Sequence, residues 1–349
     1  MTIHLDDLAA YGWNPFFSAQ LDPDDFSKAV AVRVIAVHRN ALEVAGPDLA
    51  KKVPPYFSDE NGNPDNATVG DWLLLDPDTL HPFQRLQRKS LFQRRAAGTQ
   101  NKSQLIAANI DTLFIVTSCN QDFNIARLER YLVMAREADV TPVVTITKAD
   151  QVDNAQDYVQ AAAKLSPGLL VEALNARDPK CIEHLAPWCA KGQTVAMIGS
   201  SGVGKSTLIN TLSGTRKITT QGIREDDAKG RHTTSGRTLY RLPGGGWIID
   251  TPGMRELQLT DVKAGIETVF ADILDLQGQC KFNDCQHEAE PGCAVLAALE
   301  KGDLEAERYK RWKKLATEEA LNTSTQSERR NRDRAFGKTI KTAIKNKRR

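Results

Sequence analysis

The sequence predicts a multidomain chain with a small β-barrel, an α/β sheet domain and a helical unit that binds a metal. Three observations lead to this division of the 349 residues. Short strand patterns crowd residues 29–110, and strands alternate with helical patterns over 111–258. Strand patterns then stop, and a cysteine cluster lies within 259–325. An acidic extension, 1–28, and a basic tail, 326–349, flank these three parts.

Residues 29–110 are typical of a small barrel. The stretch AVAVRVIAV places valines at 30, 32 and 34 between small or charged residues, which indicates a strand. Further short strand signals follow at 42–44, 72–75 and 104–108. The segment from Pro47 to Asn66 is rich in Pro, Asn, Asp and Gly and predicts a long loop. A barrel of this size fits an OB-fold, a frequent nucleic-acid binder, and also fits an SH3-like barrel.

The pattern changes after Asp111. The run TLFIVTS is continuously apolar, as expected for a buried parallel strand, and ARLERYLVMAREA has the apolar spacing of a helix. Further strands are expected at 142–148, 168–174 and 194–199, with helices at 156–165, 181–190 and from Lys205. The strands at 238–242 and 247–250 are separated by PGGG, so we expect a hairpin that adds an antiparallel edge to the sheet.

The stretch GSSGVGKST matches the P-loop pattern between a strand and a helix. Glycines allow backbone N–H groups to converge on phosphates at the helix N-terminus. Lys205 is expected to neutralise the outer phosphates, and the Ser206 hydroxyl to coordinate Mg²⁺. The alternative is a chance glycine-rich turn. The expected phosphate-binding residues are Gly199, Ser200, Ser201, Gly202, Val203, Gly204, Lys205, Ser206 and Thr207.

Two downstream motifs complete a triphosphate site. DTPG closes the strand WIID, so Asp250 is placed for a second Mg²⁺ contact and the Gly253 N–H can sense the γ-phosphate. Between this motif and the P-loop lies GRHTT, where Thr233 or Thr234 could close over Mg²⁺ and the γ-phosphate. Thr234 is the preferred of the two.

The tetrapeptide TKAD, residues 147–150, predicts a guanine-binding element. An Asp carboxylate accepts hydrogen bonds only, and guanine offers N1–H and N2–H₂ side by side, so Asp150 would select guanine. The Lys148 stem can pack along the base, and Thr147 precedes it. The alternative is a surface turn between strand and helix. Glu172-Ala173-Leu174, at the end of another strand, is expected to form the second base loop.

The cysteine cluster is Cys280-x4-Cys285-x-His287-x5-Cys293. Three thiols and one imidazole suit a tetrahedral structural zinc with no open position. The alternative is a set of scattered reduced cysteines. The start of the sequence has no secretory signal pattern, so we expect a cytoplasmic protein in which disulfides do not form.

Charge is strongly segregated although the net charge is +2. Residues 79–110 contain Arg or Lys at six positions and no acid, and residues 329–349 contain ten basic residues and one acid. A solvated face or a solubilising tail explains one such block. Two blocks beside a nucleotide site favour a nucleic-acid partner. No apolar run approaches the roughly 20 residues that span a membrane, so we expect no membrane partner.

The base-reading motif precedes the P-loop, which is a cyclic rotation of the usual GTPase order. Together with RKSLFQRRAAG at 88–98, GRHTT, DTPG and the cysteine cluster, this order resembles the ribosome small-subunit-dependent GTPase A family. The resemblance covers nearly all of the chain beyond residue 28. It implies a circularly permuted P-loop GTPase with GTP/GDP, Mg²⁺ and one structural Zn²⁺, and the small ribosomal subunit and its rRNA as partners. Glu172 departs from the family, in which the second base loop begins with Ser.

The resulting hypothesis is a monomeric enzyme that hydrolyses GTP during late assembly of the small subunit. Ras-like GTPases orient water with a Gln directly after DxxG, and Met254 stands there in this sequence. The catalytic candidate within the chain is His232 in GRHTT, and the alternative is a group supplied by the subunit. Two other classes are an RNA-binding module that holds GTP without hydrolysing it and a P-loop ATPase or kinase. Asp150 argues against the last.

Overall fold

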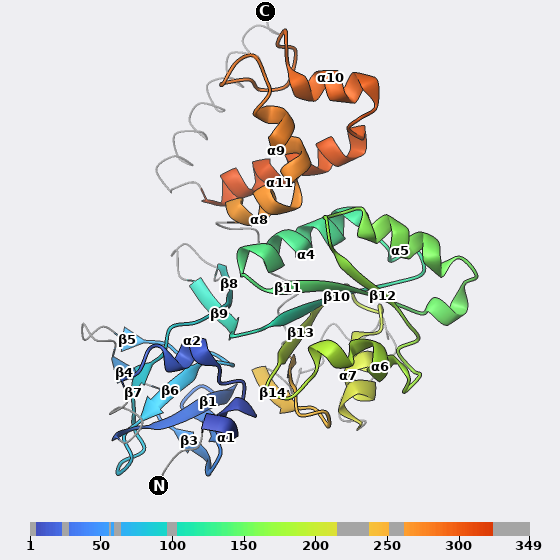
Figure 1. The fold of residues 1–349 in the computed structure, drawn as a ribbon. Helices are drawn as coiled ribbons and strands as arrows, with labels where there is room; N and C mark the ends of the chain where they lie inside the picture. Colours follow the sequence, from blue (N-terminus) through green and yellow to red (C-terminus); the bar gives the residue numbers. More distant parts are fainter. Residues whose placement is uncertain are drawn as a thin grey trace, which may run out of the picture. The chain divides into compact units, whose positions relative to one another are not determined.

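The structure is a computed structural model whose elements are shown in Figure 1. It describes residues 5–22, 28–55, 57–58, 64–95, 103–214, 237–250 and 262–323. Residues Met1–Gln258 and Leu259–Arg349 form two compact units.

The centre of the first unit is a parallel sheet in the order β12-β11-β10-β13-β15, with β14 antiparallel beside β15. Every residue of β10 is buried, which explains its uninterrupted apolar sequence. Helices α4 and α5 cover one face of this sheet, and α6 and α7 cover the other (Figure 1). The strands are β10 (Thr112–Ser118), β11 (Thr141–Thr147), β12 (Leu170–Ala173), β13 (Thr194–Ile198), β14 (Arg237–Arg241) and β15 (Trp247–Asp250). The helices are α4 (Ile125–Glu137), α5 (Ala155–Ala163), α6 (Cys181–Leu185) and α7 (Lys205–Ser213), with short 3₁₀ turns at Ala149–Gln151 and Ala186–Trp188.

An antiparallel barrel-like sheet in the order β7-β6-β1-β2-β3 precedes this part of the chain. Its strands are β1 (Val30–Val37), β2 (Leu42–Gly46), β3 (Leu49–Val53), β6 (Trp72–Leu75) and β7 (Pro82–Arg85). Two short pairs accompany it: β4 (Phe57–Ser58) with β5 (Pro64–Asp65), and β8 (Leu91–Arg95) with β9 (Ser103–Ala108). Alternate residues of β1 enter the barrel core, which contains Val32, Val34, Leu42, Val44, Val53, Leu73 and Leu75.

The segment expected to be one long loop, from Pro47 to Asn66, contains strands. Residues Leu49–Val53 form β3, which pairs antiparallel with β2 after a tight turn at Pro47-Asp48. Strand propensity is low for LAKKV because Ala and Lys are poor strand formers, so sequence patterning alone missed it. Its two lysines are exposed, as is common on edge strands, where charge discourages unwanted pairing.

The hairpin β14–β15 forms with the expected antiparallel pairing, but β14 is not at the edge of the sheet. β14 pairs with β15 on one side and with β1 on the other, in the register Ala36↔Thr238 and Val37↔Arg237. The α/β sheet and the barrel sheet are therefore continuous through β14. The sequence did not indicate this because both sides of the pair have ordinary strand patterns, and only tertiary structure selects the partner.

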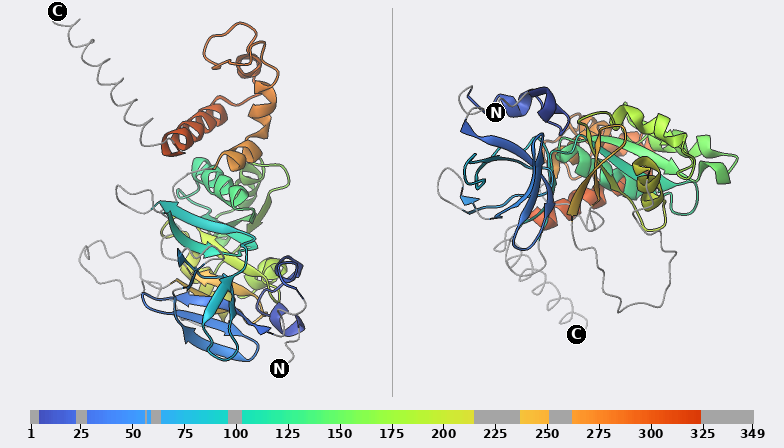
Figure 2. Two further views of the ribbon diagram at one scale, coloured as in Figure 1. Left: turned by 90° about the vertical axis from the view of Figure 1, so that its left-hand side faces the viewer. Right: turned by 90° about the horizontal axis from the view of Figure 1, so that it is seen from below.

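The N-terminal residues pack on the outer face of the barrel rather than projecting from it. Helices α1 (Leu5–Ala9) and α2 (Pro15–Ser18) lie against the barrel strands in both views of Figure 2. Their apolar side chains Leu8, Trp13 and Phe17 form one cluster with Ala29, Ala31, Trp72, Leu74 and Leu86. The Trp13 and Trp72 rings meet edge to face, with centroids 4.8 Å apart. Burial of such side chains contributes roughly 1.5–3 kcal/mol each, so this segment is part of the fold.

Arg33 lies on the same outer face of β1 and is 1% exposed. Its guanidinium donates to the carbonyls of Tyr11 at 2.6 Å, Asn109 at 3.2 Å and Gly70 at 3.4 Å. Burial lowers the pKa of Arg33 to about 10, against the opposing effect of Asp111 and Asp71, so it stays charged at neutral pH. One side chain thus joins the N-terminal segment, the barrel and the start of the α/β domain.

Gly70 makes this junction possible. It has φ +92°, and a Cβ at this position would lie 2.0 Å from the Ala108 carbonyl oxygen. Its own carbonyl accepts from both Arg33 Nε and Asn109 Nδ2. A residue with a side chain cannot occupy this place without moving the backbone of β9.

The second unit is helical in its described residues, 262–323. Its helices are α8 (Lys263–Val269), α9 (Ala271–Gln277), α10 (Ala294–Lys301) and α11 (Ala306–Thr323). Arg308 of α11 fixes the turn between α8 and α9. Its guanidinium pairs with Asp272 at 2.7 Å, donates to the Val269 carbonyl at 3.0 Å and lies 4.9 Å from the Phe270 ring centroid.

We expect Arg33→Met to lower the free energy of unfolding of the protein by about 3 kcal/mol, because the carbonyls of Tyr11, Gly70 and Asn109 each lose a charged donor. The measurement is urea denaturation. Arg39→Met removes an exposed guanidinium two residues after the end of β1 and serves as the matched control. Equal stability of the two variants would contradict the structural role assigned to Arg33.

Candidate functional site

The P-loop connects β13 to α7, as the sequence predicted. Its first residue, Gly199, has φ +153°, and a Cβ there would lie 2.1 Å from the Val116 carbonyl oxygen of β10. The loop therefore approaches the neighbouring strand as closely as a backbone can. Ser201 and Gly202 at the tip of the loop are exposed, and the helix starts directly after Gly204. This arrangement presents backbone N–H groups and the positive end of a helix to an incoming phosphate.

The Lys205 side chain folds back onto the loop. Its ammonium group donates to the Gly199 carbonyl at 2.8 Å and also to the Ser200 carbonyl. Both acceptors belong to the loop that a phosphate would enter, so the ammonium group is already positioned at its mouth. Ser206 and Thr207 follow in the first turn of α7, half-buried.

The TKAD motif lies beside the P-loop, at the carboxyl end of β11. Thr147 is fully buried, and its hydroxyl donates to the Val203 carbonyl of the P-loop at 2.6 Å. Lys148 adopts φ +59°, and Asp150 is exposed in the short 3₁₀ turn that follows. The structure thus joins two motifs that are separated by about fifty residues in the sequence.

These loops occupy the crevice at which ligands bind in open α/β sheets. From β10 the chain moves outward to β11 and β12, and it then returns to place β13 on the other side of β10. The strand order therefore reverses between β10 and β13, and the P-loop follows β13 at this point. Asp250 ends β15, the next strand along the sheet, so the backbone of DTPG starts at the same edge.

Glu172 does not begin the second base loop. It lies inside β12, paired with Thr145 in the sheet register, and its carboxylate is 3.4 Å from Nδ1 of His184. The loop starts at Leu174, whose carbonyl accepts from the Ala149 N–H of TKAD at 3.4 Å. The expected loop was displaced by about two residues, because an apolar strand gives no sharp signal for its last residue.

Several expected residues lie outside the described part of the chain. These include His232, Thr233 and Thr234 of GRHTT, Gly253 of DTPG, and the basic tail from 326. Asp250 is described as the last residue of β15, without its side chain. Their roles stay predictions.

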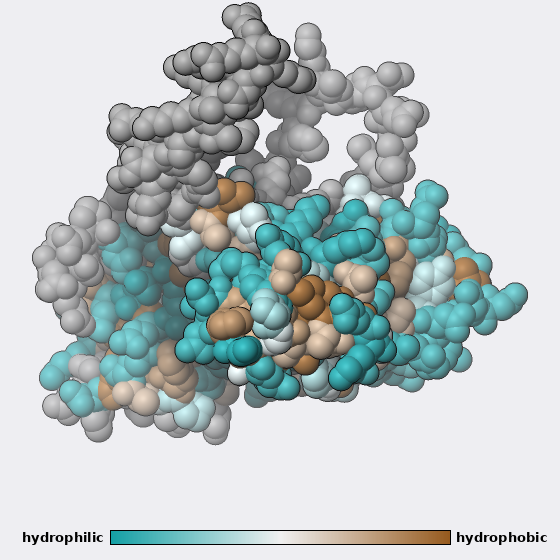
Figure 3. Space-filling model, turned by 90° about the horizontal axis from the view of Figure 1, so that it is seen from above, coloured by the Kyte–Doolittle hydropathy of each residue, from teal (hydrophilic) through white to brown (hydrophobic). Residues whose placement is uncertain are grey.

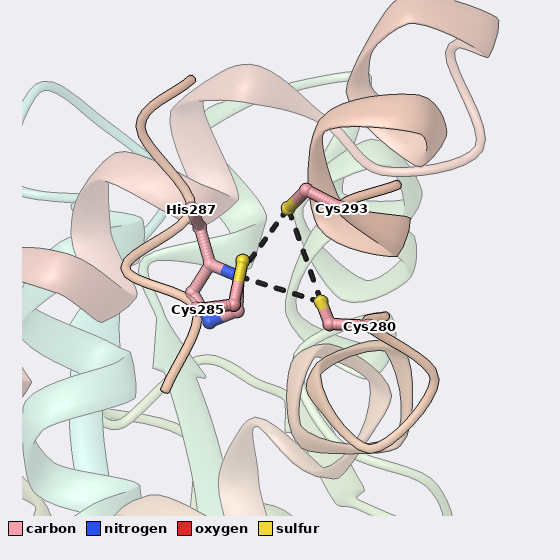
Figure 4. Close-up of side chains that lie close together, drawn as sticks. All are labelled: Cys280, Cys285, His287 and Cys293. Carbon is pink, nitrogen blue, oxygen red and sulfur yellow. Dashed lines mark hydrogen bonds between the residues drawn. The ribbon is translucent and has the colours of Figure 1, made fainter. Parts of the chain in front are cut away.

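The cysteine cluster is brought together in the second unit. Cys280 follows the end of α9, Cys293 precedes α10, and Cys285 and His287 come from the connecting loop. The three sulfur atoms and one ring nitrogen of His287 point toward a common centre (Figure 4). One ligand atom from each residue lies within 4.8 Å of all the others.

The donor set fits tetrahedral zinc. Zinc bonds of about 2.3 Å to sulfur and about 2.0 Å to nitrogen imply ligand separations of about 3.8 Å for two sulfurs and about 3.5 Å for nitrogen and sulfur. The Sγ atoms of Cys280 and Cys293 are 3.9 Å apart, and His287 Nδ1 is 3.6 Å and 3.4 Å from them. His287 is therefore oriented to bind through Nδ1.

Two supporting residues escaped the sequence analysis. The side-chain amide nitrogen of Gln277 lies 2.8 Å from His287 Nε2. With Nδ1 on zinc, Nε2 carries the proton, so the amide would turn its oxygen to the ring to act as the second partner of a zinc-bound histidine. The Glu290 carboxylate accepts from the backbone N–H groups of Gln286, Glu288 and Ala289, and these bonds lower its pKa to about 2. The sequence offered one signal for Gln277, which is its place three residues before the ligand Cys280. Glu290 had no such signal.

Most of the described basic side chains of the block at 79–110 form ion pairs within the chain. Arg85 pairs with Asp65 at 2.9 Å, Lys89 with Asp111 at 3.3 Å, and Arg88 bidentately with the fully buried Asp71 at 2.7 and 2.8 Å. These cations stabilise the barrel and its junction. Their charge is balanced within the chain, because the acids that pair with them come from outside the block.

Teal residues dominate the face in Figure 3, and brown residues form small groups among them. Within the described ranges, no helix has both the length and the apolar character needed to cross a bilayer.

Solved structures share the fold. YjeQ from Thermotoga maritima matches with a TM-score of 0.59 and 24% identity, over 82% of this chain and 97% of that one. YloQ, described as a circularly permuted GTPase, matches with a TM-score of 0.60 and 23% identity, over 85% of this chain and 97% of that one. The permuted order expected from the motifs is therefore confirmed as a known fold.

Sequence relatives are closer. Small ribosomal subunit biogenesis GTPase RsgA 2 of Vibrio parahaemolyticus is 48% identical over 98% of this chain and 94% of the relative. Small ribosomal subunit biogenesis GTPase RsgA of Mesorhizobium japonicum is 51% identical over 92% of both. The model of the RsgA GTPase family matches residues 85–260. With a shared sequence, a shared fold and the nucleotide loops at one sheet edge, this chain belongs to the RsgA GTPase family.

Proposed function

We propose that the protein hydrolyses GTP during maturation of the small ribosomal subunit in the cytoplasm, and that the subunit stimulates this reaction. The observation that carries the proposal is the bond from Thr147 to the Val203 carbonyl, which joins the guanine-reading motif to the phosphate loop. A guanine nucleotide can contact both motifs at once only if they are neighbours. We infer the small subunit as partner from the names of the relatives, which are small ribosomal subunit biogenesis GTPases.

The site residues divide the nucleotide between them. Asp150 reads the guanine edge, Lys148 packs along the base, and the loop from Gly199 to Thr207 holds the phosphates with Lys205 at its mouth. Ser206 and Asp250 would hold Mg²⁺, which neutralises charge between the phosphates when bound. Thr234 and the Gly253 N–H would sense the γ-phosphate, and His232 or a group from the subunit would orient the attacking water.

The other parts of the chain would bind the subunit. We assign rRNA binding to the barrel of 29–110 and to the basic tail, 326–349, and a structural zinc to the helical unit of 259–325. Because Arg85, Arg88 and Lys89 are paired internally, the exposed Lys51 on β3 is a better candidate for phosphate contact than those three. We expect the protein to act as a monomer that is released after hydrolysis.

Guanine selectivity tests the role of Asp150. We expect Asp150→Asn to weaken GTP binding on the order of 100-fold, because two hydrogen bonds to a charged acceptor are lost. Xanthosine triphosphate should bind the variant better than GTP does, since the amide can donate to the base carbonyl. Competition binding measures both, and Asp153→Asn, an exposed neighbour, is the control. An unchanged preference would remove Asp150 from the base site.

Metal analysis tests the zinc site. We expect one zinc per wild-type chain and less than one in Cys285→Ser, because a hydroxyl replaces a thiolate ligand. Cys189→Ser changes a buried thiol of the other unit and should keep the metal. Equal zinc content in wild type and Cys285→Ser would rule out the assignment.

Single-turnover hydrolysis, with and without small subunits, tests the enzyme itself. With Met254 after DTPG, the free protein should be slow, on the order of 10⁻⁴ per second as in unassisted Ras. Partner assistance in other GTPases reaches roughly 10³- to 10⁵-fold, which bounds the expected stimulation. Absence of stimulation in the wild type would favour a module that holds GTP without turnover.

The same assay separates the two sources of the water-orienting group. His232→Ala should lose most of the stimulated rate while it still binds GTP and subunits, and His184→Ala, an exposed histidine elsewhere in the domain, should not. Normal stimulation of His232→Ala would show that the subunit supplies the group.

A further inference from the structure

Two hydrogen bonds hold the phosphate loop, one on each side of its tip. After the tip, the Val203 carbonyl accepts from the Thr147 hydroxyl. Before the tip, the guanidinium of Arg127 donates through Nη1 to the hydroxyl of Ser200. Ser201 and Gly202 lie between these hydrogen bonds and are exposed. Both sides of the tip are thus held while the tip is open to a ligand.

Arg127 reaches the loop because of the sheet topology. β10 and β13 are parallel neighbours in the register Ile115↔Ile198, so the helix after β10 begins beside the loop after β13. Its position within α4 is fixed by the cap residue Asn124, whose side-chain oxygen accepts from the Arg127 N–H at 2.9 Å. From this position, the half-buried side chain of Arg127 reaches the Ser200 hydroxyl.

The charge of Arg127 is unfavourable to its own helix. Arg127 is the third residue of α4, and the first turn contains no acid. A cation near a helix N-terminus opposes the helix dipole and is therefore unfavourable there. The start of α7 and the Lys205 ammonium group place further positive charge at the neighbouring phosphate loop. A bound phosphate would bring negative charge to this loop and would offset the unfavourable charge of Arg127.

We propose that Arg127 is a positioning residue of the nucleotide site: by holding Ser200 it keeps the phosphate loop in its binding conformation. The Arg127–Ser200 hydrogen bond holds the first part of the loop and therefore supports the binding of GDP and GTP alike. This inference rests on the proposed guanine-nucleotide function. It assigns Arg127 no contact with the reacting atoms, so turnover at saturating GTP does not depend on it.

A double-mutant cycle tests the Arg127–Ser200 hydrogen bond. Arg127→Ala and Ser200→Ala should each weaken GDP and a non-hydrolysable GTP analogue about tenfold, as expected for loss of a hydrogen bond to a charged group. The double variant should bind no more weakly than either single variant, because one interaction is lost in all three. Ser200→Thr, which keeps the hydroxyl, should bind more tightly than Ser200→Ala. Lys164→Ala, an exposed cation after α5, controls for loss of charge alone.

Fluorescent-nucleotide binding, melting temperature and single-turnover rate at saturating GTP are measured for each variant. Strictly additive losses, or an Arg127→Ala variant that binds as wild type does, would overturn the inference. So would a large fall in rate with unchanged affinity, which would place Arg127 on the transition state. If wild type itself binds no guanine nucleotide, the proposed function fails as well, so the two failures are distinguishable.

Discussion

The buried guanidinium of Arg33 is the interaction on which the arrangement of the first unit depends. Three carbonyls from three separate segments converge on it, at Tyr11, Gly70 and Asn109. A backbone carbonyl that loses its partner in the interior destabilises the fold by about 1–3 kcal/mol, so the bonds to Arg33 favour the arrangement that brings the three segments together. The pairing of β1 with β14 joins the barrel to the α/β sheet at a second place.

Strand β15 connects this junction to the nucleotide loops. Trp247, the first residue of β15, donates through its indole N–H to the Ala10 carbonyl at 2.9 Å, and its ring is 5.5 Å from that of Tyr11. The same strand ends at Asp250. The N-terminal segment therefore contacts one end of a four-residue strand whose other end enters DTPG. A polyanion that fixes the barrel would also fix β1, and through it β14 and β15.

The sequence predicted the parts of the site that lie within short motifs. The P-loop, TKAD and the cysteine cluster each place several chemically specific residues within fifteen positions, so chance matches are rare. The strands of the α/β domain were also predictable because β10, β11 and β13 are buried on both faces. Features that depend on tertiary partners were not. Pairing of Arg88 with Asp71, seventeen residues away, looks from sequence like a free basic residue, and the role of Ser200 depends on a helix seventy-three residues earlier.

The permuted order of motifs changes the covalent path out of the site and leaves the site itself intact. Parallel strands bring their carboxyl ends to one edge whichever strand the chain enters first, so TKAD can precede the P-loop without loss of geometry. In this order β15 is the last strand of the sheet, and DTPG is followed within a dozen residues by α8 of the helical unit. If Gly253 binds the γ-phosphate, hydrolysis removes a contact at the start of the segment that leads from β15 to α8. A GTPase of ordinary order would return to its own sheet after DxxG, whereas this chain leaves it. The nucleotide state would then act on the segment that leads to the helical unit, so the permutation has a physical consequence.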